Sequence, residues 1–408
     1  MECGGSYELK QLCNALSITS TSAASPRRHR IAVGVFFFIA GFTFASWASR
    51  IPDIQGKLGL SEAALGTVLL ALPIGLMVSL LMAGGLITRI GSKPVLLLAA
   101  CLYAVVLCCL GLANHTWQLV LGLFFFGIVA NLFNIAVNTQ GVAVEKLYGR
   151  SILASFHGIW SLAGFSGAAV GMLMVQLQLL PWQHFAISAV AGLLMMLLAQ
   201  PQLLRQRGQQ EGKQPAFAWP DKKIMQLGLI AFGCLVCEGT MFDWSGVYFK
   251  KVVQAPAALH TLGYSLFMGC MAAGRFVADK VVMRTGTRRM LQGSGIAMAT
   301  GLMLAVLWPG IVPASIGFVM VGFGVSSVVP MVYSQAGQSK TMHPGQALAA
   351  VSTVGFLGFM AGPPLIGFVA EASSLRWSFA LVALIGLSTT VLAGTLKSPA
   401  GSAAPATV

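Results

Sequence analysis

The sequence predicts an all-α integral membrane protein in which twelve transmembrane helices form two pseudo-symmetric bundles of six. Three observations support this: an apolar composition, apolar runs of membrane length, and an internal repeat. Hydrophobic residues make up 56% of the 408-residue chain and charged residues only 9%, with a mean hydropathy of +0.80. Soluble domains average roughly 45–50% apolar and about 25% charged residues. Lipid is therefore the solvent of most of this chain.

The apolar runs are each about 20 residues long, which is enough to cross a hydrocarbon core roughly 30 Å thick. We place twelve spans near residues 31–52, 62–88, 94–113, 117–139, 151–179, 182–200, 224–249, 259–283, 290–308, 311–334, 346–370 and 377–396.

The basic residues orient the spans. With a cytoplasmic N-terminus, most of the 25 Lys and Arg residues fall on the inner side, and the outer side holds Arg50, Lys57, Lys250, Lys251 and Arg376. This positive-inside bias predicts that both termini are cytoplasmic. The net charge of +14 does not indicate nucleic-acid binding, because no segment is long enough to form a soluble basic domain.

The chain repeats itself at an offset of 195 to 197 residues. "FASWAS" matches "MFDWSG", which aligns Trp47 with Trp244, and "TRIGSK" matches "MRTGTR", which aligns Gly91 with Gly286. Two six-helix halves with the same orientation are parallel repeats, and transporters built this way place their substrate site near the midplane between the repeats.

The repeat divides the chain into five segments. We expect a disordered N-terminal tail at 1–27, a six-helix bundle at 28–200, a polar cytoplasmic linker at 201–223, a second bundle at 224–397 and a C-terminal tail at 398–408. The first segment is rich in Ser, Thr and Ala and has no charged-then-apolar signal pattern.

This organisation resembles the major facilitator superfamily across residues 28–397. The resemblance rests on six plus six spans, a basic central loop and R-x-G turns after the second and eighth spans. "FASWASRIPDIQ", "NTQGVAVE", "EGTMFDW" and "GPPLIGFVAE" are similar to the YbjJ-like branch of bacterial inner-membrane transporters. The resemblance implies that the first, fourth, seventh and tenth spans line a central cavity.

The inner gate departs from the superfamily pattern. The consensus G-x-L-A-D-R-x-G-R-K reads "GGLITRIGSK" here, with Arg89 kept and Thr88 in place of the Asp, and Arg284 is the counterpart of Arg89 in the second half. We expect Arg89 and Arg284 to act in gating. Arg275 and Asp279 are spaced i, i+4 and are candidates for a replacement ion pair.

Glu238 and Asp243 are the most informative polar residues, since both lie inside the seventh span. A charge at mid-bilayer costs about 2.5–3.5 kcal/mol on insertion scales, so such residues normally face a cavity or a partner. Burial disfavours the charged form of an acid, which makes both residues candidates for proton coupling. Alternatively, Glu238 is a hydrogen-bonded residue that holds helices together.

Asp243 has a second possible role near the outer mouth. Its repeat counterpart is Ser46, and Arg50 lies one turn beyond Ser46, so an Arg50–Asp243 pair is a candidate outer gate. Asp53, at i+3, competes for Arg50, and the sequence leaves both pairings open.

A polar stripe predicts the substrate-binding surface. Asn131, Asn134 and Asn138 lie within about 60° of one another on a helical wheel, and Ser326 and Tyr333 share one face of the tenth span. The alternative is that these residues join helices by hydrogen bonds, at roughly 0.6 kcal/mol each.

Aromatic residues complete this predicted surface. Trp47, Trp160 and Trp244 offer apolar faces, and His157 is a candidate ligand or proton relay, although a lone histidine is more often a packing residue. Hydroxyl-binding groups beside apolar faces favour a sugar-like solute.

We therefore expect a secondary active transporter working by alternating access. It would be proton-coupled and would move a small neutral or weakly charged polar solute across a bacterial inner membrane, with sodium as the alternative coupling ion. No Walker loop or catalytic constellation is present, so we do not expect an enzyme. We expect no cofactor or metal, and a monomer in the lipid bilayer.

Two rival functions stay open. One is a proton-driven efflux antiporter for amphipathic compounds, which is compatible with aromatic and Met-rich walls. The other, of a different class, is a membrane receptor or assembly subunit that transports nothing.

Overall fold

A computed structural model describes residues 25–149, 152–205, 220–339 and 341–396, and every regular element within this part is helical. The predicted tails and most of the predicted linker lie outside these residues. The first described helix begins at Pro26, because proline suits the first turn of a helix. Residues 26–27, which we assigned to the tail, are therefore helical.

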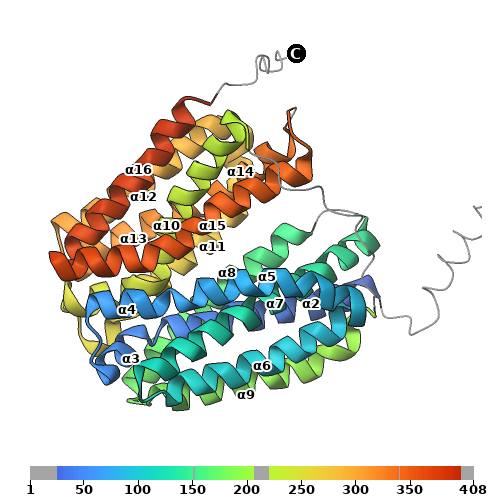
Figure 1. The fold of residues 1–408 in the computed structure, drawn as a ribbon, viewed down its shortest axis with the longest axis horizontal. Helices are drawn as coiled ribbons and strands as arrows, with labels where there is room; N and C mark the ends of the chain where they lie inside the picture. Colours follow the sequence, from blue (N-terminus) through green and yellow to red (C-terminus); the bar gives the residue numbers. More distant parts are fainter. Residues whose placement is uncertain (1–24, 150–151, 206–219, 340, 397–408) are drawn as a thin grey trace, which may run out of the picture.

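The first bundle, coloured blue to green in Figure 1, precedes the linker. It consists of α2 (Pro26–Ala48), α3 (Ile51–Leu58), α4 (Glu62–Leu69), α5 (Ala71–Ile90), α6 (Ser92–Leu112), α7 (Thr116–Tyr148), α8 (Leu153–Gln176), α9 (Pro181–Ala199) and the short 3₁₀ helix η1 (Gln200–Gln202). The first two predicted spans are each divided between two helices.

The second bundle, coloured yellow to red, follows the linker. It consists of α10 (Lys222–Lys251), η2 (Ala257–Leu259), α11 (Leu262–Thr285), α12 (Thr287–Leu307), α13 (Ile311–Val325), α14 (Val328–Gly337), α15 (Pro344–Ala372) and α16 (Leu375–Gly394).

The predicted fold class is confirmed. Among the described residues, eleven helical segments are long and apolar enough to cross a membrane. Helix α11 has a similar length of 24 residues but carries Arg275, Lys280 and Arg284, which lower its hydropathy. It packs within the second bundle beside α13.

The internal repeat is visible in two tight turns. Gly91 joins α5 to α6 with φ of 93°, and Gly286 joins α11 to α12 with φ of 78°. Both values lie in a region that glycine adopts without steric cost. The two glycines aligned by the repeat therefore perform the same turn in each half.

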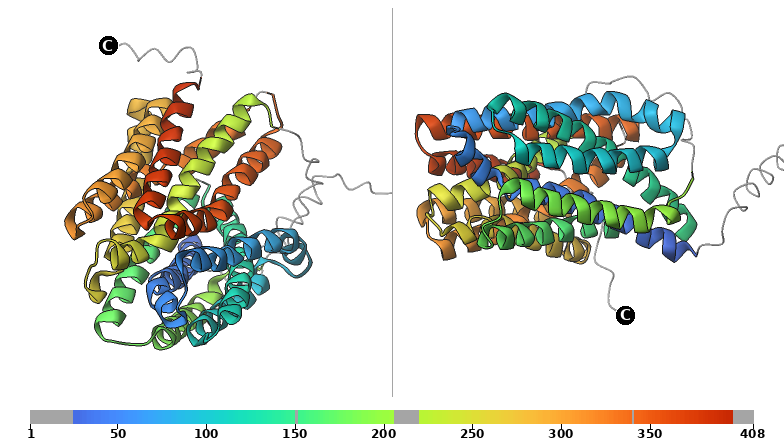
Figure 2. Two further views of the ribbon diagram at one scale, coloured as in Figure 1. Left: turned by 60° about the vertical axis from the view of Figure 1, so that its left-hand side comes forward. Right: turned by 90° about the horizontal axis from the view of Figure 1, so that it is seen from below.

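The two bundles converge at one end and diverge at the other (Figures 1 and 2). At the convergent end, a Cβ added to Gly66 of α4 would lie 2.5 Å from the carbonyl oxygen of Pro363 in α15. At the divergent end, where α9 ends and α10 begins, a Cβ added to Gly84 or Gly85 would meet nothing within 4 Å. Leu81 is 87% exposed there. The structure is thus closed at one end and open at the end bearing the linker.

Candidate functional site

Glu238 lies in the middle of α10 and is buried, with only 6% of its surface exposed. It is 16 residues beyond Lys222 in a helix of 30 residues, or about 24 Å along the axis. Its Oε1 atom lies 3.8 Å from Nη2 of Arg275 on α11. The carboxylate therefore has a cationic partner inside the membrane span.

Arg275 connects this carboxylate to the other bundle. Its Nη1 donates a hydrogen bond of 2.6 Å to Oγ of Ser161 on α8, and its guanidinium lies 5.9 Å from the ring centre of Trp160. We expected Arg275 near the inner end, paired with Asp279, whose side chain lies outside the described residues. Arg275 instead lies near the middle of α11, about 20 Å from Leu262, and its guanidinium binds across the two bundles.

An aromatic layer covers the pair on the side of the convergent end. Its central ring is Phe242, one turn beyond Glu238 on α10. Ring centres of five residues from both bundles lie between 5.3 and 6.4 Å from it: Phe44, Trp160, Tyr264, Phe267 and Phe359. Most of these contacts are edge-to-face, a favoured aromatic geometry. The packed rings separate Glu238 from the closed end.

Trp47 and Trp244 do not contribute to this surface. They are 1% and 0% exposed, and neither indole N–H has a hydrogen-bond partner within the described chain. Trp47 packs on Phe126 inside the first bundle, with ring centres 6.4 Å apart. In this conformation both are core residues, contrary to the predicted contact with substrate. Trp160, by contrast, is half-buried beside Arg275.

The asparagine stripe divides into two parts. Asn131 is buried and donates from Nδ2 to the carbonyl oxygen of Leu76 in α5, so it joins two helices, as the alternative interpretation proposed. Asn134 is exposed, and Asn138 donates to its Oδ1 atom over 2.9 Å. Asn134 lies nine residues from Phe125, which leaves the two side chains about 180° apart around the helix axis. Asn134 is therefore on the face of α7 opposite to Phe125, an exposed apolar residue.

The tenth-span residues also differ from each other. Ser326 is buried and its Oγ donates to the carbonyl oxygen of Phe323 over 2.7 Å, so its hydroxyl is satisfied locally. The hydroxyl of Tyr333 accepts a hydrogen bond of 3.1 Å from Ser352 on α15, and this side chain is half-buried. Tyr333 is therefore the better candidate for a ligand contact.

His157 is exposed on α8, one turn before Ser161. Its ring packs edge-to-face on Phe37, with centres 5.4 Å apart. The position beside the central pair is compatible with a ligand contact, and the proton-relay role stays a prediction.

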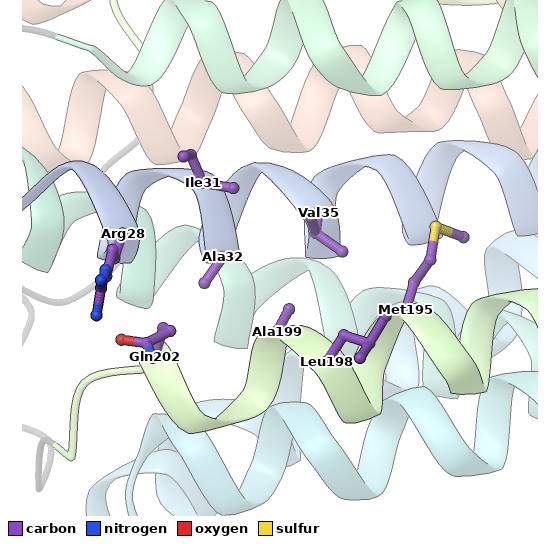
Figure 3. A pocket seen from close by; sticks show the side chains of 8 residues that line it. All are labelled: Arg28, Ile31, Ala32, Val35, Met195, Leu198, Ala199 and Gln202. Carbon is purple, nitrogen blue, oxygen red and sulfur yellow. The ribbon is translucent and has the colours of Figure 1, made fainter. Parts of the chain in front are cut away.

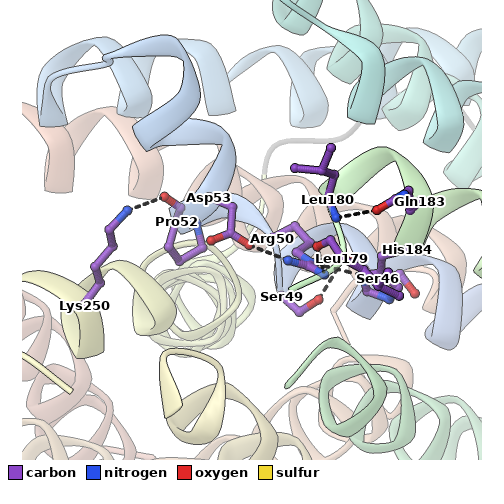
Figure 4. A network of polar contacts seen from close by, with 10 residues as sticks. All are labelled: Ser46, Ser49, Arg50, Pro52, Asp53, Leu179, Leu180, Gln183, His184 and Lys250. Atoms are coloured by element: carbon purple, nitrogen blue, oxygen red, sulfur yellow. Dashed lines mark hydrogen bonds and ion pairs between the residues drawn. The ribbon is translucent and has the colours of Figure 1, made fainter. Parts of the chain in front are cut away.

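Arg50 does not pair with Asp243 within the described structure. Its Nη1 binds Oδ2 of Asp53 over 2.8 Å, its Nε donates to Nδ1 of His184, and its Nη2 donates to the carbonyl oxygen of Leu179 (Figure 4). The local alternative, Asp53, is thus the partner. His184, which our interpretation of the sequence did not single out, helps to hold Arg50 between α3 and α9.

Other charged residues join the bundles at the convergent end. Nζ of Lys251 lies 2.5 Å from Oε1 of Glu62, and Nζ of Lys250 donates over 2.8 Å to the carbonyl oxygen of Pro52. Glu371 accepts from the backbone N–H of Ala63 over 3.3 Å. We counted the two lysines as external but did not identify them as closing contacts, because their partners are almost 200 positions away.

Arg89 and Arg284 lie at the divergent end. Both are exposed, and neither forms an ion pair with any residue that the structure describes. A latch between the bundles is therefore not engaged through these arginines here, and their gating role stays a prediction.

The described helices form two bundles, and comparison with known proteins decides the family. Residues 31–341 and 261–407 match the Major Facilitator Superfamily. The chain belongs to the Major Facilitator Superfamily. An uncharacterized MFS-type transporter of Yersinia pestis is 34% identical, over 88% of this chain and 93% of the relative. The membrane protein MosC of Rhizobium meliloti is 27% identical, over 87% of each. Assignment to the YbjJ-like branch stays a prediction.

Solved structures of this superfamily share the fold. A crystal structure of the nucleoside transporter NupG aligns with a TM-score of 0.70 at 14% identity, over 90% of this chain and 100% of that one. A bacterial homolog of the human lysosomal transporter Spinster, in an inward-facing and occupied conformation, aligns with a TM-score of 0.69 at 13% identity, over 91% and 97%. At these identities the likeness establishes the fold alone.

Proposed function

We propose that this chain is a proton-coupled secondary transporter that moves a small neutral or weakly charged polar solute by alternating access. Glu238 is the residue that binds the proton. The observation that carries the proposal is the link from Glu238 through Arg275 to Ser161, because it joins the two bundles in the middle of the membrane spans.

The distance between Glu238 and Arg275 allows the guanidinium of Arg275 to exchange the carboxylate for a solute atom. At 3.8 Å, the Glu238–Arg275 contact is an ion pair but is longer than a hydrogen bond. Protonation of Glu238 removes the negative charge and leaves the guanidinium without its counter-ion, which is costly in an apolar setting. A hydroxyl or carbonyl oxygen of the solute then becomes a better partner for Arg275. Proton binding and solute binding therefore favour each other.

The charges at the site favour a solute with little or no net charge. One carboxylate and one guanidinium cancel, and Trp160 and Tyr333 add an apolar face and a hydroxyl beside them. In the proposed topology, the divergent end with the linker faces the cytoplasm of a bacterial inner membrane, so the structure corresponds to the inward-open state.

The test compares Glu238→Gln with Asp243→Asn in proteoliposomes. The solute is first chosen by a thermal-shift screen of the purified protein against sugars, nucleosides, amino acids and dyes. Glu238→Gln should abolish accumulation driven by a proton gradient and keep counterflow exchange. Asp243 lies five residues further along α10, about 140° around the helix. Its variant tests the other acid predicted for proton coupling. Retained accumulation in Glu238→Gln would refute the coupling role of Glu238, and a loss in Asp243→Asn alone would assign that role to Asp243.

A proton-driven efflux antiporter is the second candidate, favoured by the aromatic layer around Phe242. It predicts that an amphipathic dye accumulates in inside-out vesicles when their interior is acidic, because protons leaving the vesicle drive the dye inward. Accumulation of dye in acidic-inside vesicles, with no transport of polar solutes, would favour this alternative. Replacing the proton gradient by a sodium gradient in the same vesicles distinguishes the two coupling ions.

A further inference from the structure

A groove of about 280 Å³ runs between α2 and α9 on the outside of the first bundle (Figure 3). Its walls are apolar along most of their length, and the polar side chains lie at one end. Its lining includes Arg28, Ile31, Val35, Met195, Leu198 and Gln202.

The groove has a fixed direction relative to the membrane. Arg28 and Gln202 lie at its polar end, and Val35 and Met195 lie seven residues away on each helix, or about 10 Å. Nδ1 of His29 lies 2.6 Å from the carbonyl oxygen of Gln202, which ties the two helices together at the polar end. The apolar part therefore extends from the membrane surface toward the midplane.

Arg205 lies three residues beyond Gln202 in the chain, and Lys93 lies close to Arg205. Nε2 of Gln140 donates over 2.8 Å both to Oγ of Ser92 and to the carbonyl oxygen of Leu204. This places the next residues, Lys93 and Arg205, close enough for their charges to repel each other.

These cations lack acidic partners in the described chain. Arg27 and Arg28 are exposed, as is Arg205, and the three described ion pairs involve Arg50, Lys251 and Arg275 only. A cluster of unpaired positive charge at the mouth of an apolar groove is complementary to an amphiphile with an anionic head. At a membrane surface, each such residue contributes about 1 kcal/mol to attraction of anionic lipid.

We propose that the groove binds one acyl chain of an anionic phospholipid of the leaflet at the linker end, with the lipid phosphate against Arg28 and Arg205. Ile31 and Leu198, which are 57% and 82% exposed, then lie against the chain. The ligand is a lipid, because a free phosphate would use the cations but not the groove.

Native mass spectrometry of the full-length protein in detergent tests this site. Phosphatidylglycerol should bind more tightly than phosphatidylcholine with the same acyl chains, and inorganic phosphate should not compete. The double variant Arg28→Gln/Arg205→Gln should weaken phosphatidylglycerol binding roughly 25-fold, at about fivefold for each cation, and phosphatidylcholine binding much less, because the choline cation offsets the charge of its phosphate. Arg289→Gln, an exposed cation on α12 in the other bundle, is the matched control and should change neither.

A second variant tests the apolar part. Ala199→Phe places a ring in the groove and should reduce binding of both lipids, and its melting temperature shows whether the protein is folded. If it does not fold, the charge variants decide alone. Equal binding of both lipids, an unchanged affinity in the double variant, or an equal loss in Arg289→Gln would each overturn the proposal.

Discussion

Gly66→Ala should shift the protein away from the conformation of the structure, toward one that is open at the convergent end. Helices α4 and α15 touch through their backbones at the convergent end. A Cβ on Gly66 would lie 2.5 Å from the carbonyl oxygen of Pro363, and a Cβ on Gly367 would lie 2.5 Å from that of Glu62. Ordinary contact begins at 3.4 Å, so the helices must separate by about 0.9 Å to admit one methyl group. Small residues permit such close contact between membrane helices.

The size of the shift follows from the cost of overpacking. Adding a methyl group to a well-packed contact costs about 1–3 kcal/mol. Because the contact exists only when this end is closed, the cost falls on one conformation and changes the equilibrium by about 5- to 150-fold. Gly293→Ala adds the same methyl group to an exposed position of α12, where nothing lies within 4 Å, and should leave the equilibrium unchanged.

The assay is a spin-label distance between Thr88→Cys on α5 and Thr285→Cys on α11, in a background without the other exposed cysteines. Both positions are exposed at the divergent end and belong to different bundles. Gly66→Ala should add a population at a shorter distance, because the divergent end closes as the other end opens. An unchanged distance distribution, or an equal change in Gly293→Ala, would refute the reasoning.

Three further predictions concern polar contacts. Reversing the charge of Lys251 or of Glu62 alone should raise the population at the shorter spin-label distance by up to about fivefold, as expected for a partly exposed pair, and reversing both should restore the original distribution. Hydrogen bonds from Thr341 and from the first turn of α10 lower the pKa of Asp221 below its usual value of 3.8. The Asp221 carboxylate therefore stabilises the fold fully above that pH, and the contribution is lost as pH falls through the lower pKa of the folded state. Asp221→Ala should therefore remove about 1 kcal/mol of cap stability at pH 7 and less at pH 3. The melting temperature should fall more at pH 7 than at pH 3, and an equal fall at both would contradict this. Arg50→Lys should also lower the melting temperature, because one ammonium group cannot reach all three partners of this guanidinium, and an unchanged value would count against that role.

The fold could be predicted because its causes are local in the sequence. Apolar length predicts each span, and Gly91 and Gly286 mark turns that need a positive φ. The burial of Glu238 was also predictable, since an acid among apolar residues must lie inside. Its partners were not, because Arg275 and Ser161 belong to other helices and only packing decides which side chains meet.

For Arg50 the error was of a different kind. The pairing with the distant residue Asp243 was given the same weight as the pairing with the neighbouring residue Asp53. The chain breaks its helix between Ala48 and Ile51, so Arg50 lies at the start of α3, where Asp53 is in its first turn. An acid in that turn is favoured by the helix dipole and is within reach of the guanidinium. Asp243 is half-buried on the continuous helix α10 and is left without an ion pair among the described residues.

Breaks in the first and tenth spans distinguish the two halves of the repeat, and a proline follows each of these breaks. Proline lacks the N–H that would continue a helix. Pro52 follows the break between α2 and α3, and Phe249 stands at the equivalent place on unbroken α10. Pro330 follows the break between α13 and α14, and Ile135 stands at the equivalent place on unbroken α7. Each half therefore has one broken helix among the four spans expected to line the cavity, and the breaks fall on different members of the repeat. A Cβ on Gly274, which precedes Arg275 on α11, would lie 2.4 Å from Oγ of Ser326 at the second break. A change of angle at that break must displace the backbone next to Arg275, which links a hinge in the second bundle to the cation that the proposed coupling requires.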